Sequence, residues 1–592
     1  MRGQGVRAHG VAVAAVAGAW VAPAVAVWTV PAVGLVWFGL RRSRAAFGAL
    51  MVAVFVLTAA SASHAHSGLD FPDAGPFDGW VTLVDDPRAS GPVGVRVTVR
   101  SGRQRLVVSG HGAVAGRIDD ALAGERLHLV GTIRPVSRGD DRSIHRHVVG
   151  RVTVEEVVAF ADGAPVAAAA NAVRRTLEGG AGSLSRDDRA LFLGMVIGDD
   201  RDQGPVTADD FRAAGLGHVL VVSGQNVAFV LAVAMPLAGR FRPAGRAAVL
   251  LTVLGLFAVM TRFEPSVLRA TAMAGLGIGS SALGRPSDGR TGLSLAVAGL
   301  LVIDPFLVHI VAFRLSAAAT AGIVWLGPGL ADRLPLPSWL AVPVSTTVAA
   351  QLAVSPVLVA IFGPIPLASL PANLLAGPAS GAVMIWGCTG GVLAGVAGDP
   401  LATVLHWPTR ALLWWVGEVA ELSASAPTAT LGGWALAGIA AAVIAALRLH
   451  SKGIGIASAL FSGVVCALAL LVAPEVPDGV RFLGDGVTLV SQGDQSVVIL
   501  DDPGRARDVL ERLRMAGARQ LVLIVALDGD RADADAVLAL HDRFGSIPTA
   551  APPLHRVPGA RTVRPGRLIR AGPIEVQVLE VEPRIEFIAS FA

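Results

Sequence analysis

The chain has 592 residues, of which 53% are hydrophobic and only 16% are charged, and its mean hydropathy is +0.60. A composition this apolar excludes an ordinary soluble protein and predicts a polytopic α-helical membrane protein. The formal net charge is only +4, and the basic residues are nearly all arginine, a bias that genomic base composition explains more simply than nucleic-acid binding. Cys388 and Cys466 both lie in apolar segments, so the polar domains have neither a disulfide framework nor a thiolate metal site.

About 20 consecutive apolar residues span a bilayer as a helix, and roughly ten to twelve segments of the chain are candidates. Residues 11–40 predict two closely connected helices, and a third follows at about 45–61. The arginine cluster at 41–44 favours the cytoplasmic side, so the third helix should deliver the chain outside the cell near Ser63. A cleaved signal peptide is the alternative for the start of the chain, but the apolar segments that follow at once favour an uncleaved anchor.

Residues 64–160 consist of short runs in which apolar and polar residues alternate between Gly, Pro and Asp. Such alternation predicts antiparallel strands, and five of them suit a small barrel such as the OB-fold. That fold often holds single-stranded nucleic acid on aromatic side chains, but only Trp80 and Phe77 lie near the first strand, so a purely structural barrel stays equally open. The pairs HAH at 64–66 and HRH at 145–147 have the spacing that places two rings on one face of a strand, which by itself makes no metal site.

Residues 187 to about 473 form the main apolar body, whose last helix, about 454–473, follows the basic stretch LRLHSK. That charge favours the cytoplasm, so the tail beyond 475, in which strand, helix and strand patterns alternate, should be an α/β unit outside the cell. The predicted domains are N-terminal transmembrane helices at 1–62, an extracellular OB-like β domain at 63–162, a polytopic channel domain at 163–474 and an extracellular α/β domain at 475–592.

The stretch 216–239 would be an ordinary membrane span without four polar side chains: His218, Ser223, Gln225 and Asn226. Polar groups at membrane depth are costly unless they pair or line a wet cavity, which makes them candidates for function. One helix face could carry all four; alternatively, Ser223 and Gly224 break the helix and expose backbone groups to a cavity. Hydrogen bonding between packed helices is the structural alternative.

Arg269 interrupts an otherwise apolar segment, and Arg262 and Arg314 lie close to others. A conduit for a phosphate polyanion needs positive groups along a wet path, spaced so that no single site traps the strand. The structural alternatives are an ion pair with a carboxylate such as Glu264 and, for Arg314, snorkelling to the membrane interface. We expect the charged turn at 199–202 to be a solvated loop.

The segment 190–234 resembles the central domain of the ComEC family, the inner-membrane channel for DNA uptake in natural transformation. The family's hallmark is a glycine, a His-Leu-like pair and a Ser-Gly-x-His or Ser-Gly-x-Asn motif, which fall here on Gly215, His218, Ser223, Gly224 and Asn226. Further landmarks follow in the family's order at 265–274, 304–316, 349–363 and 370–378. With a barrel before the channel and a strand-rich domain after it, the resemblance covers nearly the whole chain.

This resemblance implies a multi-pass channel for single-stranded DNA in the plasma membrane. Its expected partners are the strand, lipid and other competence proteins, namely a DNA receptor and a cytoplasmic ATPase or helicase. The DNA path is expected to be lined by His218, Ser223, Gly224, Gln225, Asn226, Arg269, Arg314, Gln351 and Asn373. We expect no cofactor, and since no nucleotide-binding motif appears, energy must come from a partner or from the membrane potential.

The tail departs from the family. Many members end in a metallo-β-lactamase-like domain with a His-x-His-x-Asp-His-type motif, and the hairpin-like stretch 491–501 implies a shortened form of that fold here. The corresponding place carries Asp528, Asp530, Asp533 and Asp535 without a histidine, so we expect no metal site and no catalytic residue. Two other functions stay open: a membrane-anchored nuclease acting through these carboxylates, and a transporter of another anion. The missing histidines count against the first, and the ordered motifs count against the second.

Overall fold

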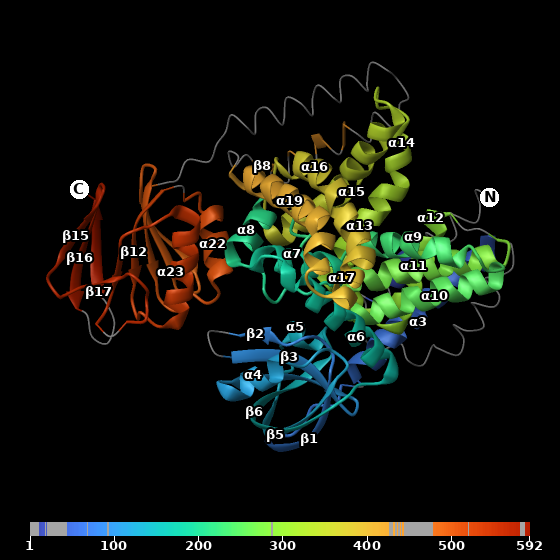
Figure 1. Ribbon diagram of the computed structural model, residues 1–592, viewed down its shortest axis with the longest axis horizontal. Helices are drawn as coiled ribbons and strands as arrows, with labels where there is room; N and C mark the ends of the chain where they lie inside the picture. Colours follow the sequence, from blue (N-terminus) through green and yellow to red (C-terminus); the bar gives the residue numbers. More distant parts are fainter. Residues whose placement is uncertain are drawn as a thin grey trace.

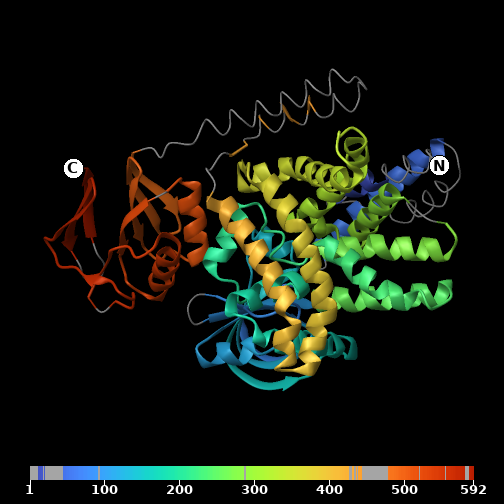
Figure 2. The same cartoon turned by 45° about the horizontal axis from the view of Figure 1, so that its top comes forward.

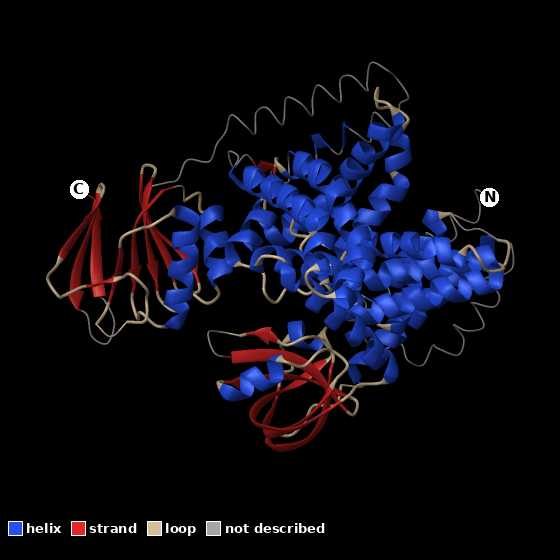
Figure 3. Ribbon diagram, viewed as in Figure 1, coloured by secondary structure: helices blue, strands red, loops and turns tan. Residues whose placement is uncertain are grey.

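The computed structural model describes residues 11–17, 19, 44–442 and 478–591, with gaps at 68, 91–93, 286–287, 426–429, 432–434, 436–437, 440, 519, 554 and 581–585. The last predicted membrane helix, at 454–473, and most of the two predicted at 11–40 lie outside the described residues. The described chain forms a helical body, a small β domain and a C-terminal α/β domain (Figures 1 and 3).

Helices form the body of the molecule, and they are preceded by α3 (Arg44–Ser67), which packs against α12. In chain order they are α6 (Pro165–Gly180), α7 (Arg186–Ile197), α8 (Pro205–Ala213), α9 (Gly224–Ala238), α10 (Pro243–Met260), α11 (Pro265–Ala282), α12 (Gly289–Ile303), α13 (Val311–Trp325), α14 (Gly327–Ala331), α15 (Ser338–Phe362), α16 (Ser369–Trp386), α17 (Val392–Ala397), α18 (Leu401–Leu405) and α19 (Trp407–Ser425). Two short strands, β7 (Ile365–Pro366) and β8 (Thr430–Leu431), pair beside them.

Within the described residues, three helical segments are long and apolar enough to cross a membrane. They are α10, α15 and the continuous segment Ser369–Ala397, in which a π-helical stretch, Gly387–Gly391, joins α16 to α17. Three further apolar helices, α9, α12 and α13, are shorter. The predicted class, a helical membrane protein with added β-sheets, is confirmed at this level.

The β domain is a ring of strands. β1 (Gly75–Leu83), β3 (Gly94–Ser101), β4 (Gln104–His111), β5 (Arg126–Pro135) and β6 (Val148–Ala161) lie in the order β1-β5-β6-β4-β3, and the two-residue β2 (Arg88–Ala89) extends β3. Because β1 also pairs with β3, the five longer strands close on themselves. β4 and β6 run parallel, and α4 (Ala113–Asp119) follows β4 and packs on the ring. Inward residues such as Val99, Leu106 and Leu127 fill the core, as the alternating pattern predicts.

The two histidine pairs do not lie on strands, contrary to the prediction. His64 and His66 lie in the last turn of α3, because the apolar run continues as a helix to Ser67. His145 caps the four-residue α5 (Asp141–Ile144), and His147 follows in the left-handed region at a φ of 60°. Residues two apart on a helix point in different directions, so the expected shared face does not exist for His64 and His66.

The C-terminal domain contains the predicted strand, helix and strand units. One sheet has the order β14-β13-β12-β11-β10-β9. Its strands are β9 (Gly479–Gly484), β10 (Val487–Gln492), β11 (Gln495–Leu500), β12 (Gln520–Ala526), β13 (Thr549–Ala551) and β14 (Arg561–Thr562). The helices α22 (Ala506–Met515) and α23 (Arg531–Phe544) follow β11 and β12, and the strands β15 (Leu568–Ala571), β16 (Ile574–Glu580) and β17 (Glu586–Phe591) form a second sheet.

Both strand-rich domains rest on the helical body (Figures 1 and 2). The C-terminal domain contacts α8 through α22 and α23. The β ring sits beside α6, which continues the chain directly from β6 into the body.

Candidate functional site

The polar stretch after α8 is a turn followed by a helix. The chain leaves α8 through Gly215, whose φ of 71° is readily adopted only by glycine, and a Cβ there would lie 2.4 Å from the Cβ of Ser369. α9 begins only at Gly224, and Ser223 is its N-cap, its hydroxyl accepting the Gln225 N–H at 3.3 Å. The interpretation in which one helix face carries all four polar residues is therefore wrong. No helix runs through Ser223–Gly224, as the alternative predicts, and the cavity expected beside this point stays a prediction.

The four polar side chains have different surroundings. His218 lies in the turn and is exposed, and Gln225 is exposed in the first turn of α9. Asn226 is buried, and its Nδ2 donates to the Met195 carbonyl of α7 at 2.8 Å. The Ser223 hydroxyl donates to Asn226 Oδ1 at 3.1 Å, so both polar ends of this amide bind protein. Asn226 thus ties α9 to α7, which is the structural alternative foreseen for buried amides.

Arg269 of α11 lies against the start of α9. It is 6% exposed, its Nε donates to Ser316 Oγ of α13 at 2.8 Å, and its Nη1 lies 3.0 Å from the Met273 sulfur. A Cβ on Gly224 would come within 2.5 Å of Arg269 Nη2, so the absence of a side chain at Gly224 makes room for the guanidinium. No carboxylate of the described residues forms an ion pair with Arg269.

The remaining predicted path residues are less closely grouped. Arg314 lies on α13, two residues before Ser316, and its Nε is buried without a hydrogen-bond partner among the described residues. Asn373 of α16 donates to the Ser369 carbonyl at 2.7 Å and approaches the Gly215 carbonyl at 3.5 Å. Gln351 is half-buried on α15. The structure brings Arg269 to Gly224 and Asn373 to Gly215, whereas the Gln351 carbonyl accepts from Ser355 of its own helix, α15.

A buried ion-pair network, which the sequence interpretation missed, joins the β ring to the body. Asp86, in the loop after β1, receives two bonds from Arg174 of α6 at 2.9 and 2.5 Å and one from Arg262 at 2.6 Å. The Ala123 N–H also donates to Asp86 at 2.9 Å. Burial raises the pKa of Asp86, but the charges of Arg262 and Arg174 outweigh burial and hold this pKa well below its ordinary value.

Arg262 occupies an unusual position. It lies in the turn between α10 and α11 at a φ of 57°, and it donates to the Gly198 carbonyl at the end of α7 as well as to Asp86. The structural alternative for this arginine was an ion pair with a carboxylate such as Glu264, and the structure pairs it with Asp86 instead. The turn at 199–202 is likewise not a simple solvated loop, because Asp199 is 7% exposed and binds Arg201 at 2.6 Å.

Ion pairs also hold the C-terminal domain on α8. Arg514 of α22 donates to Asp209 at 3.1 Å, Arg543 of α23 donates to Asp210, and Arg212 lies 3.5 Å from Glu511. Asp209 is 2% exposed, so this contact excludes water. The helix that precedes the polar turn is therefore covered by the tail.

Two of the four tail aspartates form a helix cap. Asp530 is the N-cap of α23 and accepts the Asp533 N–H at 2.9 Å, while Asp533 accepts the Gly529 N–H at 2.8 Å. Burial, with the nearby charges of Asp530 and Asp528, raises the pKa of Asp533 to about 7. The pattern is similar to a capping box, except that Asp533 binds the N–H of Gly529, one residue before the N-cap. Among the described residues, no group of three or more His, Cys, Asp or Glu side chains is placed to hold a metal ion.

Comparisons with known proteins match the part of the chain that contains these helices. The sequence profile of the family described as Competence protein matches residues 195–452. ComE operon protein 3 of Bacillus subtilis (strain 168) is 26% identical over 212 residues, which are 36% of this chain and 27% of that relative. The chain thus matches little more than a quarter of that relative's length, and no solved structure matches it significantly. The resemblance predicted from the motifs is confirmed over the matched residues.

Proposed function

Because residues 195–452 carry the domain of the Competence protein family, we propose that this chain is a plasma-membrane channel that admits single-stranded DNA during natural transformation. The strand would pass beside the start of α9. The observation that carries the proposal is Arg269, a buried guanidinium with no carboxylate partner in the described residues.

The sequence extends this observation beyond the described residues. Residues 1–62 and 426–474, which contain the other predicted membrane helices, include no Asp and no Glu. A counter-charge for Arg269 at membrane depth therefore has to come from outside the chain. An ionised group in an apolar environment is stable only when it is paired or hydrated, so a passing phosphate or a wet lumen suits this position.

The start of α9 adds to the same field. The free N–H groups of a helix N-terminus carry a partial positive charge and favour anions. Arg269 Nη2 lies beside Gly224 in this first turn, so two positive features face the same place. The guanidinium and the helix N-terminus repel each other unless an anion binds between them. A channel for a polyanion supplies such an anion.

We place both strand-rich domains outside the cell. Arg88 of the β ring pairs with Asp200, and Asp86 of the ring binds Arg262, which also donates to the Gly198 carbonyl. The C-terminal domain contacts Asp209 and Asp210. These contact points are separated only by a short turn and by the start of the nine-residue helix α8, which is too short to cross a bilayer. These contacts support one shared side of the membrane for the two domains, and the arginine cluster at 41–44 supports the exterior as that side.

Strand order and connections also support the folds that the sequence predicts for the two domains. The closed order β1-β5-β6-β4-β3, the parallel pair β4 and β6, and a helix after β4 support an OB-like barrel. The β10–β11 hairpin and the α/β units that follow support a shortened metallo-β-lactamase-like domain. The proposed partners, a DNA receptor and a cytoplasmic ATPase or helicase, would deliver the strand and pull it inward.

A nuclease is not the better interpretation of the tail. Asp530 and Asp533 are engaged in capping α23, and burial raises the pKa of Asp533 to about 7, so this carboxyl is only partly ionised at neutral pH. Carboxylates that bind backbone N–H groups have less capacity to ligate Mg²⁺. An importer of a smaller anion would have no need of two docked strand-rich domains.

Uptake of marked DNA by a deletion strain tests the proposal. A strain that lacks this chain should lose transformation, and the intact chain should restore it. Normal transformation of the deletion strain, in a host shown to be transformable with the chain present, would remove the proposal.

A further inference from the structure

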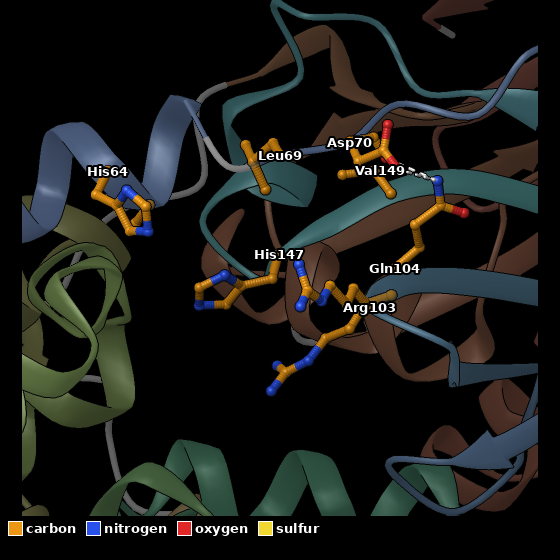
Figure 4. A pocket seen from close by; sticks show the side chains of 9 residues that line it. His64, Leu69, Asp70, Arg103, Gln104, His147 and Val149 are labelled. Carbon is orange, nitrogen blue, oxygen red and sulfur yellow. Dashed lines mark hydrogen bonds between the residues drawn. The ribbon is translucent and has the colours of Figure 1, made fainter.

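A cavity of about 240 Å³ lies between the β ring and α3, apart from the start of α9. It is lined by His64 of α3, by Arg103, Gln104 and Arg105 at the β3–β4 turn, by Asp70 and by His147. Figure 4 shows the side chains of His64, Arg103 and His147 around one open space, whereas Asp70 and Gln104 bind each other at its rim.

The two arginines of this cavity lack direct partners. The side chains of Arg103 and Arg105 form no hydrogen bond and no ion pair with a described residue. Burial lowers the pKa of Arg105, and the more distant charges of Asp304 and Asp85 partly oppose that effect. A half-buried guanidinium that no carboxylate touches is a ready anion site.

The acidic groups near the cavity are already occupied. Asp304, at the end of α12, binds His147 Nε2 at 3.1 and 3.2 Å. The Gln104 amide donates to the Asp70 carboxylate at 3.2 Å and to the Asp70 carbonyl at 3.1 Å. Both carboxylates therefore bind side chains other than the two arginines, and neither forms an ion pair with Arg103 or Arg105.

We propose that this cavity binds the phosphodiester backbone of single-stranded DNA before the strand reaches the helical body. The inference rests on the proposed function, which supplies the polyanion. Guanidinium groups suit phosphate oxygens because they donate two parallel hydrogen bonds. Both arginines belong to the β ring rather than to a membrane helix, which favours a strand outside the cell over a lipid headgroup as the source of the phosphate.

The test is binding of a dye-labelled oligothymidine to the purified full-length protein in nanodiscs of zwitterionic lipid, followed by fluorescence anisotropy at several salt concentrations. The double variant Arg103→Gln/Arg105→Gln should bind roughly ten-fold more weakly and show a shallower salt dependence, since each lost phosphate contact lowers the slope by about 0.7. Arg103→Lys/Arg105→Lys should keep most of the binding. Arg117→Gln is the matched control, because its guanidinium lies over the Phe160 ring and lines no part of the cavity.

Unchanged oligonucleotide affinity in the double glutamine variant would overturn the inference. So would a finding that this variant loses only co-purifying anionic phospholipid, because the cavity would then hold a headgroup. A failure of this inference can be distinguished from a failure of the proposed function. If the deletion strain transforms normally but the variant still loses binding, the proposed function fails and the cavity remains a DNA site.

Discussion

Asp86 and Arg262 lie 176 positions apart in the sequence and form a buried ion pair of 2.6 Å at the junction of the β ring and the helical body. Arg174 binds both oxygens of the same carboxylate, and its side chain is 1% exposed. Two guanidiniums thus share one carboxylate, although a flexible linker alone would keep the β ring attached to the helical body. The junction is therefore built to hold the β ring in a fixed position over the body.

Asp86→Asn should destabilise this junction by about 3 to 5 kcal/mol, because it leaves the buried Arg262 without its charge partner and Arg174 with only Asp199, at 3.9 Å. The measurement is thermal unfolding of the purified full-length protein, with Asp78→Asn, an exposed aspartate of β1, as the control. The folded pKa of Asp86 lies below the unfolded value, so its stabilisation is present above that unfolded value and is lost as pH falls through the folded one. The deficit of the variant should therefore be constant from pH 8 to pH 5, and a variant as stable as the control would contradict this account.

Asn226→Leu should reduce the amount of folded protein. It removes the bond to the Met195 carbonyl and leaves that acceptor buried, at a cost of roughly 1 to 3 kcal/mol. His218→Leu, in the exposed turn, should leave abundance near normal and lower DNA uptake. Membrane abundance measured beside uptake separates the two effects. Full abundance of Asn226→Leu would show that its hydrogen bonds contribute nothing.

Asp533 makes the stability of the C-terminal domain depend on pH. Its folded pKa of about 7 is raised, so the folded state binds more protons and stability should fall as pH rises from about 4 to about 7. Asp533→Asn should flatten this dependence, since an amide oxygen can still accept the Gly529 N–H. Hydrogen exchange of α23 in the full-length protein at pH 5 and pH 8 measures it, with exposed Asp542→Asn as the control. An unchanged slope in Asp533→Asn would contradict the assignment.

The shared side of the two strand-rich domains is open to cysteine labelling. In a chain without its native cysteines, Ser101→Cys in the β ring and Ser546→Cys in the tail should both react with an impermeant reagent in intact cells. Protection of one site until lysis would place that domain in the cytoplasm and contradict the contacts made with the segment 198–210.

The sequence predicts what local periodicity determines. Alternation in the β ring and the strand, helix and strand pattern of the tail both appear as predicted, and Ser223–Gly224 indicates a helix start through ordinary capping chemistry. The partners of Asp86 could not be predicted, because they lie 88 and 176 residues away and the residue looks like part of a polar turn. The histidine pairs show an error in a local interpretation. A spacing of two residues predicted a strand, but the helix α3 continues through His64 and His66.

The central claim is that Arg269 meets a passing phosphate. DNA uptake by cells carrying Arg269→Gln, Arg269→Lys or the exposed control Arg285→Gln, normalised to membrane abundance, tests it most directly. We expect the glutamine variant to reach normal abundance with uptake lowered about ten-fold or more, as loss of a charge-assisted hydrogen bond implies, and the lysine variant to keep much of its uptake. Normal uptake with Arg269→Gln, or loss of folded protein with both substitutions, would show that Arg269 serves the packing of α11 rather than the path of DNA.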